Sequence, residues 1–392
     1  MSDKIYSSNS ETSRMLVFLG SGVSYKSGLP DVNKITNEVL DGKWFKYTDQ
    51  NYWPITSDIV IPSNDNTKEI QAFLSILKDV IDPYYLERTG EACNYEDLYY
   101  VCQQISENEY GITNNPAVNP FIKEMKMQTE SLGQLNKLAK YAVYLIHCVV
   151  WRLLTNENIV KGFDLIKELI ENNIGVDIAT LNHDLLIERY LESSGIEYSD
   201  GFDKKEVDIR FISENPFESC DKVRVFKLHG SINWFRFERE IIENGKPVVL
   251  KRYGVDTIND YMHCRDLNGE YYDVSTWMPM FLSGSVNKLF KYNFGIFKHI
   301  LYHFDECLNK HNRILMSGYG WSDIGINGRL LEWLGSSMDN ALVLLHENPQ
   351  EISHKMVNSG KNVYDEYKND GRLIMIKKWF CDSNFDDLNQ QA

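Results

Sequence analysis

The sequence has no cysteine pairs at the spacing used by disulfide-rich or zinc-binding domains. Its seven cysteines are scattered and odd in number, and no Cys-x-x-Cys pair occurs. These absences argue against a disulfide framework and against a four-cysteine zinc site. His263 and Cys264 are adjacent, but no second pair lies at ligand spacing, so we expect no metal site.

Basic residues are also few, and long apolar runs are missing. The 392 residues include 41 basic and 56 acidic side chains, a net charge of −15 that would repel nucleic acid. A small anionic ligand held by a local loop is still compatible with that charge. The longest apolar run, Tyr141–Val150, is too short to span a bilayer, and the N-terminal residues show no signal-peptide pattern. We therefore expect a cytoplasmic protein without direct nucleic-acid or membrane binding.

What the sequence does contain is a strand-to-loop pattern near its start. The apolar run Met15–Leu19 ends at Gly20-Ser21-Gly22, and small residues continue through Ser24 to Asp31. Glycines at such a point allow a tight turn and let backbone N–H groups approach a phosphate. A dehydrogenase fingerprint would need a third glycine where Tyr25 stands. The loop is thus a tight turn or a nucleotide site, but not one built for hydride transfer.

Six apolar runs suit strands, and several are separated by segments with helical periodicity, such as Leu185–Leu191 and Leu289–Leu308. The runs are Met15–Leu19, Val176–Thr180, Val223–Leu228, Arg313–Ser317, Ala341–Leu345 and Arg372–Ile376. Strands that alternate with helices imply right-handed βαβ units and a parallel sheet. The predicted fold class is α/β, with a Rossmann-like parallel sheet.

Two segments interrupt this alternation. Residues 41–140 are rich in Asn, Asp, Tyr and Lys and have helical stretches, so we expect a mostly helical insertion. Residues 236–280 have turn signals between short strand-like pieces, which predicts a small β-hairpin module without zinc. Residues 1–40 and 141–392 would then form one discontinuous Rossmann-like domain.

Polar residues follow three further predicted strands. These are Thr180-Leu181-Asn182-His183-Asp184, then Leu228-His229-Gly230, then Ser317-Gly318-Tyr319-Gly320-Trp321-Ser322-Asp323. Each has a structural alternative: Asp184 or Ser322-Asp323 could cap a helix, and His229 could belong to a turn. Parallel strands place their carboxyl ends at one sheet edge, where open α/β sheets hold ligands. The joint placement of these residues favours a site there.

These motifs resemble those of the sirtuin superfamily. The segments Gly20–Ser24 and Ser27–Asp31 resemble its Gly-Ala-Gly-x-Ser and Ser-Gly-x-Pro-Asp motifs, and Thr180–Asp184 resembles its Thr-Gln-Asn-x-Asp motif. His229-Gly230 is similar to its His-Gly motif, which carries the catalytic histidine. A later cofactor loop is matched loosely by Gly318–Asp323, and Asn348 stands where the family contacts the adenosine end.

The resemblance implies NAD+ as substrate and a set of residues around it. The catalytic residues it implies are Asn182, His229 and Asp184. The binding residues it implies are Gly20, Ser21, Gly22, Ser24, Asp31, Thr180, Gly318, Gly320, Ser322 and Asn348. Backbone N–H groups of Gly20-Ser21-Gly22 would hold the pyrophosphate, Asn182 would orient the ribose or a water, and His229 would act as a base.

The sequence also departs from deacetylating sirtuins. Val32-Asn33 stand where those enzymes have Phe-Arg, and residues 236–280 lack the cysteine pairs of their zinc ribbon. The pattern LHGSINW looks more like the bacterial sirtuin-like NAD hydrolases of antiphage defence. That resemblance implies an NAD+ glycohydrolase that depletes NAD, as a homo-oligomer with a separate partner such as a HerA-type ATPase. The alternatives are an NAD-dependent protein-lysine deacylase and a non-catalytic NAD or ADP-ribose sensor.

Overall fold

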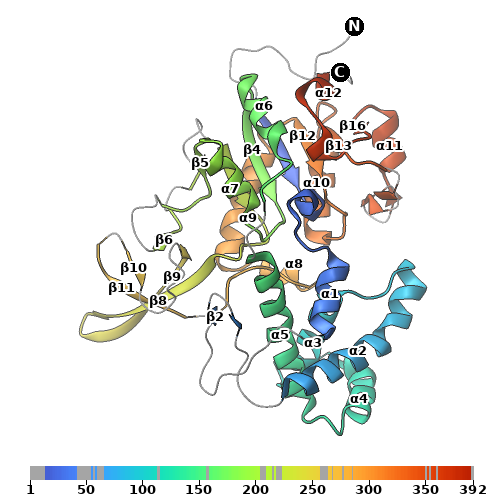
Figure 1. The fold of residues 1–392 in the computed structure, drawn as a ribbon, viewed down its shortest axis with the longest axis vertical. Coiled ribbons are helices and arrows are strands. Elements are labelled where there is room, and N and C mark those ends of the chain that lie inside the picture. The colour runs from blue at the N-terminus through green and yellow to red at the C-terminus, as the bar shows by residue number, and fades with distance from the viewer. Residues whose placement is uncertain are drawn as a thin grey trace. The chain divides into compact units, whose positions relative to one another are not determined.

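The structure, a computed structural model, divides the chain into two compact units (Figure 1). It describes residues 14–41, 54–55, 58–59, 66–112, 115–155, 159–203, 209–213, 216–217, 223–256, 264–266, 268–275, 278–284, 286–348, 351–352, 355–358 and 361–389. The first unit comprises Met1–Leu29, Glu157–Phe281 and Leu289–Ala392, and the second comprises Pro30–Asn156 and Leu282–Lys288.

A seven-stranded parallel sheet forms the centre of the first unit, in the order β16-β13-β12-β1-β4-β7-β5. Its strands are β1 (Arg14–Leu19), β4 (Gly175–Thr180), β5 (Tyr198–Ser199), β7 (Val223–Lys227), β12 (Arg313–Ser317), β13 (Ala341–Leu345) and β16 (Leu373–Ile376). All six predicted strands are confirmed within a residue at either end. The two-residue edge strand β5 is too short to show periodicity in the sequence.

Helices of the first unit connect and cover these strands. They are η1 (Ser21–Ser27), α6 (Asp164–Glu171), α7 (Leu186–Ser193), α9 (Gly295–Leu308), α10 (Ile324–Ser336), α11 (Tyr364–Asn369), η4 (Phe380–Asp382) and α12 (Phe385–Asn389). Both faces of a parallel sheet are buried under such helices, which explains the continuous apolar runs. Phe18 of β1, for example, is fully buried and its ring centre lies 6.2 Å from that of Phe304 in α9.

The strand order confirms the predicted α/β class. From β1 the chain builds outward through β4 and β7, and it later returns to the other side of β1 with β12, β13 and β16. This is the doubly wound Rossmann-type order, with β5 added at one edge. The order reverses between β1 and β12, and ligands of open α/β sheets bind beyond the carboxyl ends of strands at such a reversal.

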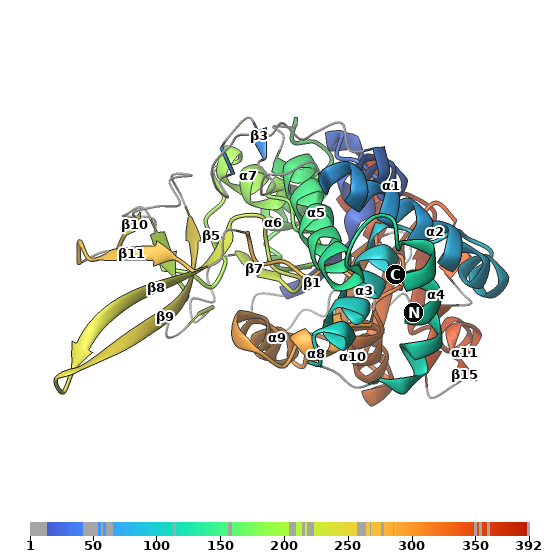
Figure 2. The ribbon, with the colours of Figure 1, turned by 90° about the horizontal axis from the view of Figure 1, so that it is seen from below.

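A second, antiparallel sheet of the first unit has the order β10-β11-β8-β9-β6. Its strands are β6 (Ile209–Phe211), β8 (Trp234–Glu243), β9 (Lys246–Asp256), β10 (Cys264–Arg265) and β11 (Tyr271–Val274). Strands β8 and β9 form a long hairpin, yellow in Figure 2, whose turn residues Asn244 and Gly245 both have positive φ. The sheet starts at Ile209, before the expected boundary at residue 236, because β6 pairs with the end of β9.

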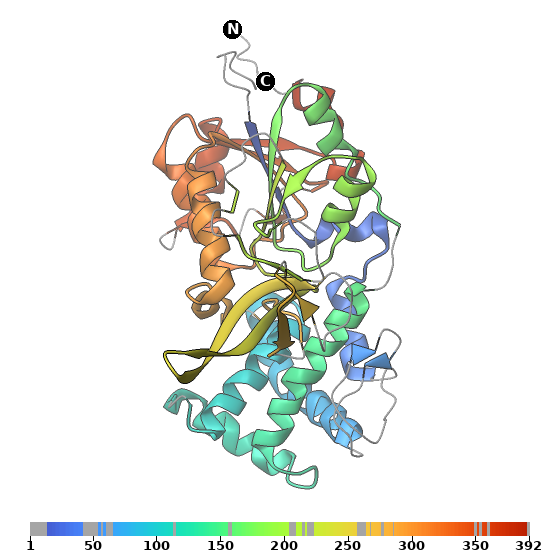
Figure 3. The same ribbon diagram turned by 90° about the vertical axis from the view of Figure 1, so that its left-hand side faces the viewer.

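The second unit is mostly helical. It holds α1 (Val32–Asp41), β2 (Pro54–Ile55), β3 (Asp58–Ile59), α2 (Asn66–Thr89), α3 (Tyr95–Glu109), η2 (Pro116–Val118), α4 (Asn119–Gln128) and α5 (Leu135–Thr155) (Figure 3). Its main segment, Pro30–Asn156, extends beyond the expected insertion of residues 41–140 at both ends. The reason is that α1 and α5 pack against each other and against α2 and α3.

Helix α5 is long and apolar enough to cross a membrane by length and composition alone. However, 61% of its most apolar window is buried inside the protein, as in the core helix of a folded domain. The remaining short elements are α8 (Lys288–Lys291), β14 (Val357–Asn358) and β15 (Lys361–Asn362). The predicted helical segment Leu289–Leu308 is therefore interrupted between α8 and α9.

Candidate functional site

Four loops leave the parallel sheet at the same level. Leu19 of β1 pairs with Thr180 of β4 and with Ser317 of β12, and Thr180 pairs in turn with Lys227 of β7. Asn182 and His229 each follow these paired residues by two positions. The structure thus places both at the carboxyl edge of the sheet, on neighbouring strands, as predicted.

The glycines after β1 and β12 let two loops meet backbone to backbone. The Gly20 amide donates to Ser317 O at 2.9 Å, and the Gly22 amide donates to Gly318 O at 3.0 Å. A Cβ on Gly20 would lie 2.4 Å from Gly318 O, and one on Gly318, which has φ +69°, would lie 2.6 Å from the Val23 nitrogen. No side chain fits between these loops.

This contact corrects the expected role of the glycine amides. We predicted that Gly20 and Gly22 donate to a pyrophosphate, but both amides already donate to carbonyls of the loop after β12. Their lack of side chains serves the approach of the two loops. Ser21 is exposed and opens η1, a 3₁₀ helix, where an α-helix would start in the usual phosphate loop.

Ser24, Asn182 and Asp184 form one buried hydrogen-bonded group. The Asn182 side-chain amide donates to Ser24 Oγ at 3.1 Å and to Gly20 O at 3.2 Å. Ser24 Oγ donates to Asp184 Oδ2 at 3.1 Å, and Asp184 Oδ1 accepts the Leu186 amide at the start of α7. One carboxylate oxygen of Asp184 therefore binds the first amide of α7, and the other belongs to the buried group.

Asn182 has one hydrogen-bonding atom left over. Its backbone amide donates to Thr180 Oγ1 at 3.1 Å, and its side-chain NH₂ is used as described. Its Oδ1 is buried and has no hydrogen-bond partner in the protein. Because an unsatisfied buried acceptor costs about 1–3 kcal/mol, such an atom calls for a ligand or a water.

A buried lysine supports the loop that carries these residues. Lys227 donates from Nζ to the backbone oxygen of Asp184, and its Nζ lies 2.8 Å from Glu188 Oε1. Burial raises the pKa of Glu188 above its ordinary value, against the opposing effect of Lys227. Sequence analysis missed this pair, because nothing local to Lys227 marks it as more than a strand residue.

His229 follows β7 by two residues, and its Nε2 contacts two side chains. The next residue, Gly230, has φ +79°, and a Cβ there would lie 2.2 Å from Met280 O, so only glycine allows this turn. His229 is 4% exposed, and its Nε2 lies 2.9 Å from Asp323 Oδ2 and 2.6 Å from the Tyr292 hydroxyl. Its ring centre is 6.0 Å from that of His183, which links it to the loop of Asn182.

Sequence analysis missed Tyr292, and it placed Asp323 in a sheet-edge motif without giving it a role beside His229. Tyr292 donates to Asp323 Oδ2 at 2.7 Å, and Asp323 Oδ1 accepts the Ile326 amide as the N-cap of α10. Burial, then the nearby Asp323, raise the pKa of Tyr292 well above its ordinary value, so it remains a donor. No local pattern links Asp323 to His229, and Tyr292 lies 63 residues from His229 with no motif around it.

The other predicted residues are more dispersed. Gly320 and Ser322 are exposed in the loop after β12, and a Cβ on Gly320 would meet open space. Asn348 is exposed beyond β13, where its side-chain amide donates to Glu351. Asp31 belongs to the second unit and accepts the Lys34 amide at the start of α1. Within the described residues, Gly320, Ser322 and Asn348 form no hydrogen bond with the Ser24–Asn182–Asp184 group.

Between Gly320 and Ser322, Trp321 has an unusual conformation. Its φ of +57° is rare for a bulky side chain, and its indole is buried. The indole Nε1 has no hydrogen-bond partner, while its backbone oxygen accepts from Asn327. Strain of this kind tends to occur at functional loops, and it sits here on the loop that meets Gly20 and Gly22.

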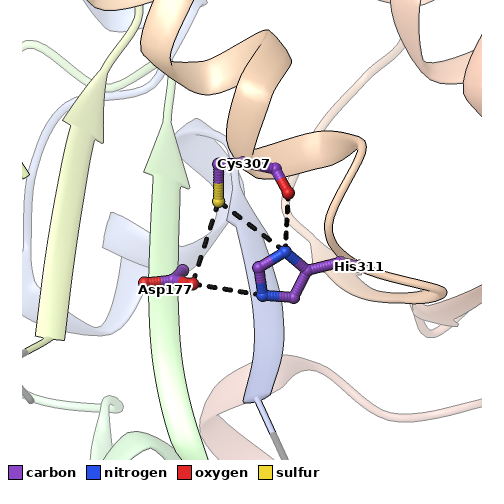
Figure 4. A group of neighbouring side chains, drawn as sticks. All are labelled: Asp177, Cys307 and His311. Atoms are coloured by element: carbon purple, nitrogen blue, oxygen red, sulfur yellow. Dashed lines mark hydrogen bonds and ion pairs between the residues drawn. The ribbon is translucent and has the colours of Figure 1, made fainter. Parts of the chain in front are cut away.

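Within the described residues, one group has the composition of a metal site: Asp177, Cys307 and His311 (Figure 4). Both Asp177 oxygens, however, already accept hydrogen bonds from Arg14 and Arg224 at 2.5–3.1 Å. Burial raises the pKa of the Cys307 thiol to about 12, which disfavours a thiolate ligand. The group is a buried ionic cluster, and its residues do not fit a metal ion.

One family model matches part of the chain. Residues 176–365, a little under half of the chain, match the family model described as SIR2-like domain. This segment is similar to a SIR2-like domain and includes Asn182, His229 and Asp323. No curated protein sequence matches the chain.

Several solved structures are distantly similar. A Sir2 homologue in complex with NAD is 12% identical, with 97% of this chain and 88% of that chain covered and a TM-score of 0.35. A structure titled for the structural basis of sirtuin substrate affinity is 12% identical, covers 91% and 92%, and has a TM-score of 0.33. One titled for the mechanism and regulation of Sir2 enzymes is 10% identical, with 92% of both chains covered and a TM-score of 0.33. Likeness at this level says nothing about activity.

Proposed function

We propose that this protein is an NAD+ glycohydrolase, which cleaves the bond between nicotinamide and ribose to give nicotinamide and ADP-ribose. The observation that carries the proposal is the unpartnered, buried Oδ1 of Asn182 at the sheet edge next to His229. The acceptor lies beside the reversal of strand order, where a nucleotide would bind. The SIR2-like match over both residues supports the choice of NAD+.

The reaction does not need a strong general acid. Nicotinamide leaves as a neutral molecule, and positive charge develops on the ribose as in glycoside hydrolysis. Asn182 Oδ1 would accept a hydrogen bond from a ribose hydroxyl or from the attacking water, in the orientation fixed by Ser24 and Gly20. His229 would take a proton from that water or hydroxyl, a contribution of roughly 10²–10⁴-fold.

The test is chromatographic measurement of nicotinamide and ADP-ribose from NAD+, with the full chain alone and together with the product of the neighbouring gene. We expect equal amounts of both products and a loss of at least about 10²-fold in Asn182→Ala and His229→Ala. His303→Ala is the matched control, since this histidine lies in the middle of α9 and pairs with Glu306. Full activity in both site variants, or no cleavage under either condition, would overturn the proposal.

The same assay separates the two alternatives. An NAD-dependent deacylase would release nicotinamide only with an acetyl-lysine peptide and would yield O-acetyl-ADP-ribose. A sensor would bind NAD+ or ADP-ribose by calorimetry without release of nicotinamide. The absence of cysteine pairs from residues 236–280 favours hydrolysis over deacylation.

We extend the proposal to the setting in which the activity is used: a cytoplasmic, homo-oligomeric subunit that depletes NAD during phage infection. The support is the resemblance of LHGSINW to antiphage NAD hydrolases. A HerA-type ATPase is the partner this resemblance implies. Co-purification with the neighbouring gene product, and cellular NAD measured during infection, test this extension separately from the chemistry.

A further inference from the structure

The contacts among His229, Tyr292 and Asp323 limit which of their polar atoms can carry a proton. His229 Nε2, Tyr292 Oη and Asp323 Oδ2 lie within 2.6–2.9 Å of one another. Asp323 Oδ2 belongs to a carboxylate and can only accept. If the hydroxyl proton of Tyr292 goes to Asp323, the contact between Nε2 and these oxygens is favourable only when Nε2 carries a proton. If that proton went to Nε2, Asp323 Oδ2 would face two atoms without protons.

From this count we propose that Asp323 and Tyr292 are positioning residues that hold His229 as its Nε2–H tautomer and so assign proton acceptance to Nδ1. This inference rests on the proposed function for its catalytic part and on geometry alone for its tautomer part. The other ring nitrogen of a neutral imidazole carries the lone pair, so the base would be Nδ1. A carboxylate that fixes a histidine tautomer is a known device in general-base catalysis.

A second feature shows that the start of α10 is shaped around this pair. Asp323 Oδ1 is fixed by the Ile326 amide, so the carboxylate cannot rotate away from His229 without loss of the helix cap. Gly325 lies in the same turn, and a Cβ there would meet the Tyr292 ring at 2.9 Å. Gly328, one turn later, has nothing within 4 Å of its Cβ position. Of these two glycines, Gly325 is the one that the packing against Tyr292 requires.

Asp323→Asn is the most informative variant, because asparagine is as good an N-cap as aspartate. The cap needs an acceptor in the position of Oδ1, so the amide NH₂ must take the position of Oδ2. It then presents a donor to His229 Nε2, which favours the Nδ1–H tautomer. The variant should therefore fold normally and reverse the tautomer.

The tautomer is measured by ¹⁵N NMR of the full chain labelled on histidine, with the His229 signal assigned by its loss in His229→Gln. We expect a protonated Nε2 and an unprotonated Nδ1 in the wild type, and the reverse in Asp323→Asn. A wild-type protein with Nδ1 protonated, or an unchanged His229 signal in Asp323→Asn, overturns the inference. This measurement does not depend on NAD+ cleavage, so it stands even where the proposed function fails.

Kinetics test the catalytic part. We expect kcat for NAD+ cleavage to fall by about 10²–10⁴-fold in Asp323→Asn, with KM changed less than about threefold. Tyr292→Phe and Gly325→Ala should lower kcat by smaller factors, while Gly328→Ala on the same helix leaves it unchanged. If Asp323→Asn reverses the tautomer but keeps wild-type kcat, His229 is correctly placed but the base assignment is wrong.

Discussion

Two buried polar side chains, one near each end of strand β4, differ in whether the protein supplies all their hydrogen-bond partners. Asp177, early in the strand, accepts four hydrogen bonds from Arg14 and Arg224 and contacts His311. Asn182, just beyond the strand end, keeps a buried Oδ1 without a partner. A buried polar group whose hydrogen bonds are all made within the protein contributes to structure. A buried acceptor without a partner in the protein instead indicates a ligand.

The comparison explains why a cluster with the composition of a metal site is a poor candidate for function. Burial opposes ionisation of Asp177, but hydrogen bonds from Arg224, His311 and Arg14 outweigh it and hold its pKa well below the ordinary value. The charges face one another and the oxygens are occupied. At the other end of the strand, the unpartnered Oδ1 of Asn182 leaves a position for another molecule.

The largest effect that tests this contrast is expected for Asp177→Asn. Removal of the one carboxylate takes this counter-charge from the buried guanidinium of Arg224 and the partly buried one of Arg14, and breaking such a buried pair costs about 3–5 kcal/mol. The free energy of unfolding, from urea titration, should fall by that amount while NAD+ turnover per folded molecule is retained. Asp339→Asn, at an exposed turn, is the control and should stay within about 0.5 kcal/mol. Equal stability of both variants would mean that the cluster contributes little.

Asn182→Ala should cost less stability and far more activity. It removes two donated hydrogen bonds, each worth about 1 kcal/mol, and also an acceptor that was unsatisfied. We expect the free energy of unfolding to fall by about 1–2 kcal/mol and NAD+ cleavage to fall by at least about 10²-fold. A stability loss as large as that of Asp177→Asn would show instead that Asn182 mainly stabilises the fold.

Acid pH gives a smaller effect with a defined sign. The folded-state pKa of Asp177 is depressed, so its stabilising contribution is complete above the unfolded value of about 3.9 and is lost as pH falls below it. Between pH 7 and pH 3 the difference in unfolding free energy between wild type and Asp177→Asn should shrink by about 1 kcal/mol. A difference that stays constant, or grows, would contradict the depressed pKa.

The smallest expected effect is that of added zinc. Because the Asp177 oxygens are occupied and the Cys307 thiol is protonated at neutral pH, we expect no zinc binding that depends on this group. Zinc content after dialysis should be the same in wild type and Cys307→Ala by elemental analysis. A loss of one zinc per chain in the variant would show that the cluster can open to a metal.

Sequence analysis predicted those features that depend on one segment at a time. The strands are apolar over their whole length because both faces of the sheet are buried, and Asn182 and His229 follow from the rule that parallel strands end at one edge. Asp184 could be interpreted as a cap or as a site residue; one of its oxygens accepts the first amide of α7, and the other accepts from Ser24.

The features that escaped prediction are contacts between distant segments. The amides of Gly20 and Gly22 are used by Gly318 and its neighbour, which no local pattern in the first loop reveals. Tyr292 falls where the predicted helix Leu289–Leu308 breaks, and Gly295 with φ +55° was the available signal for that break. The boundaries of the helical unit shifted because α1 and α5 pack with its other helices.

The meeting of the loops after β1 and β12 has a consequence for how this sequence can vary. A Cβ on Gly20 would meet the backbone of Gly318, and a Cβ on Gly318 would meet the backbone of Val23 and Gly20. In a library randomised at both positions, a replacement at either one would be rejected whatever stands at the other, and pairs of replacements would not rescue each other. Any lineage of such proteins would therefore keep both glycines through drift, even if the reaction at the sheet edge were lost.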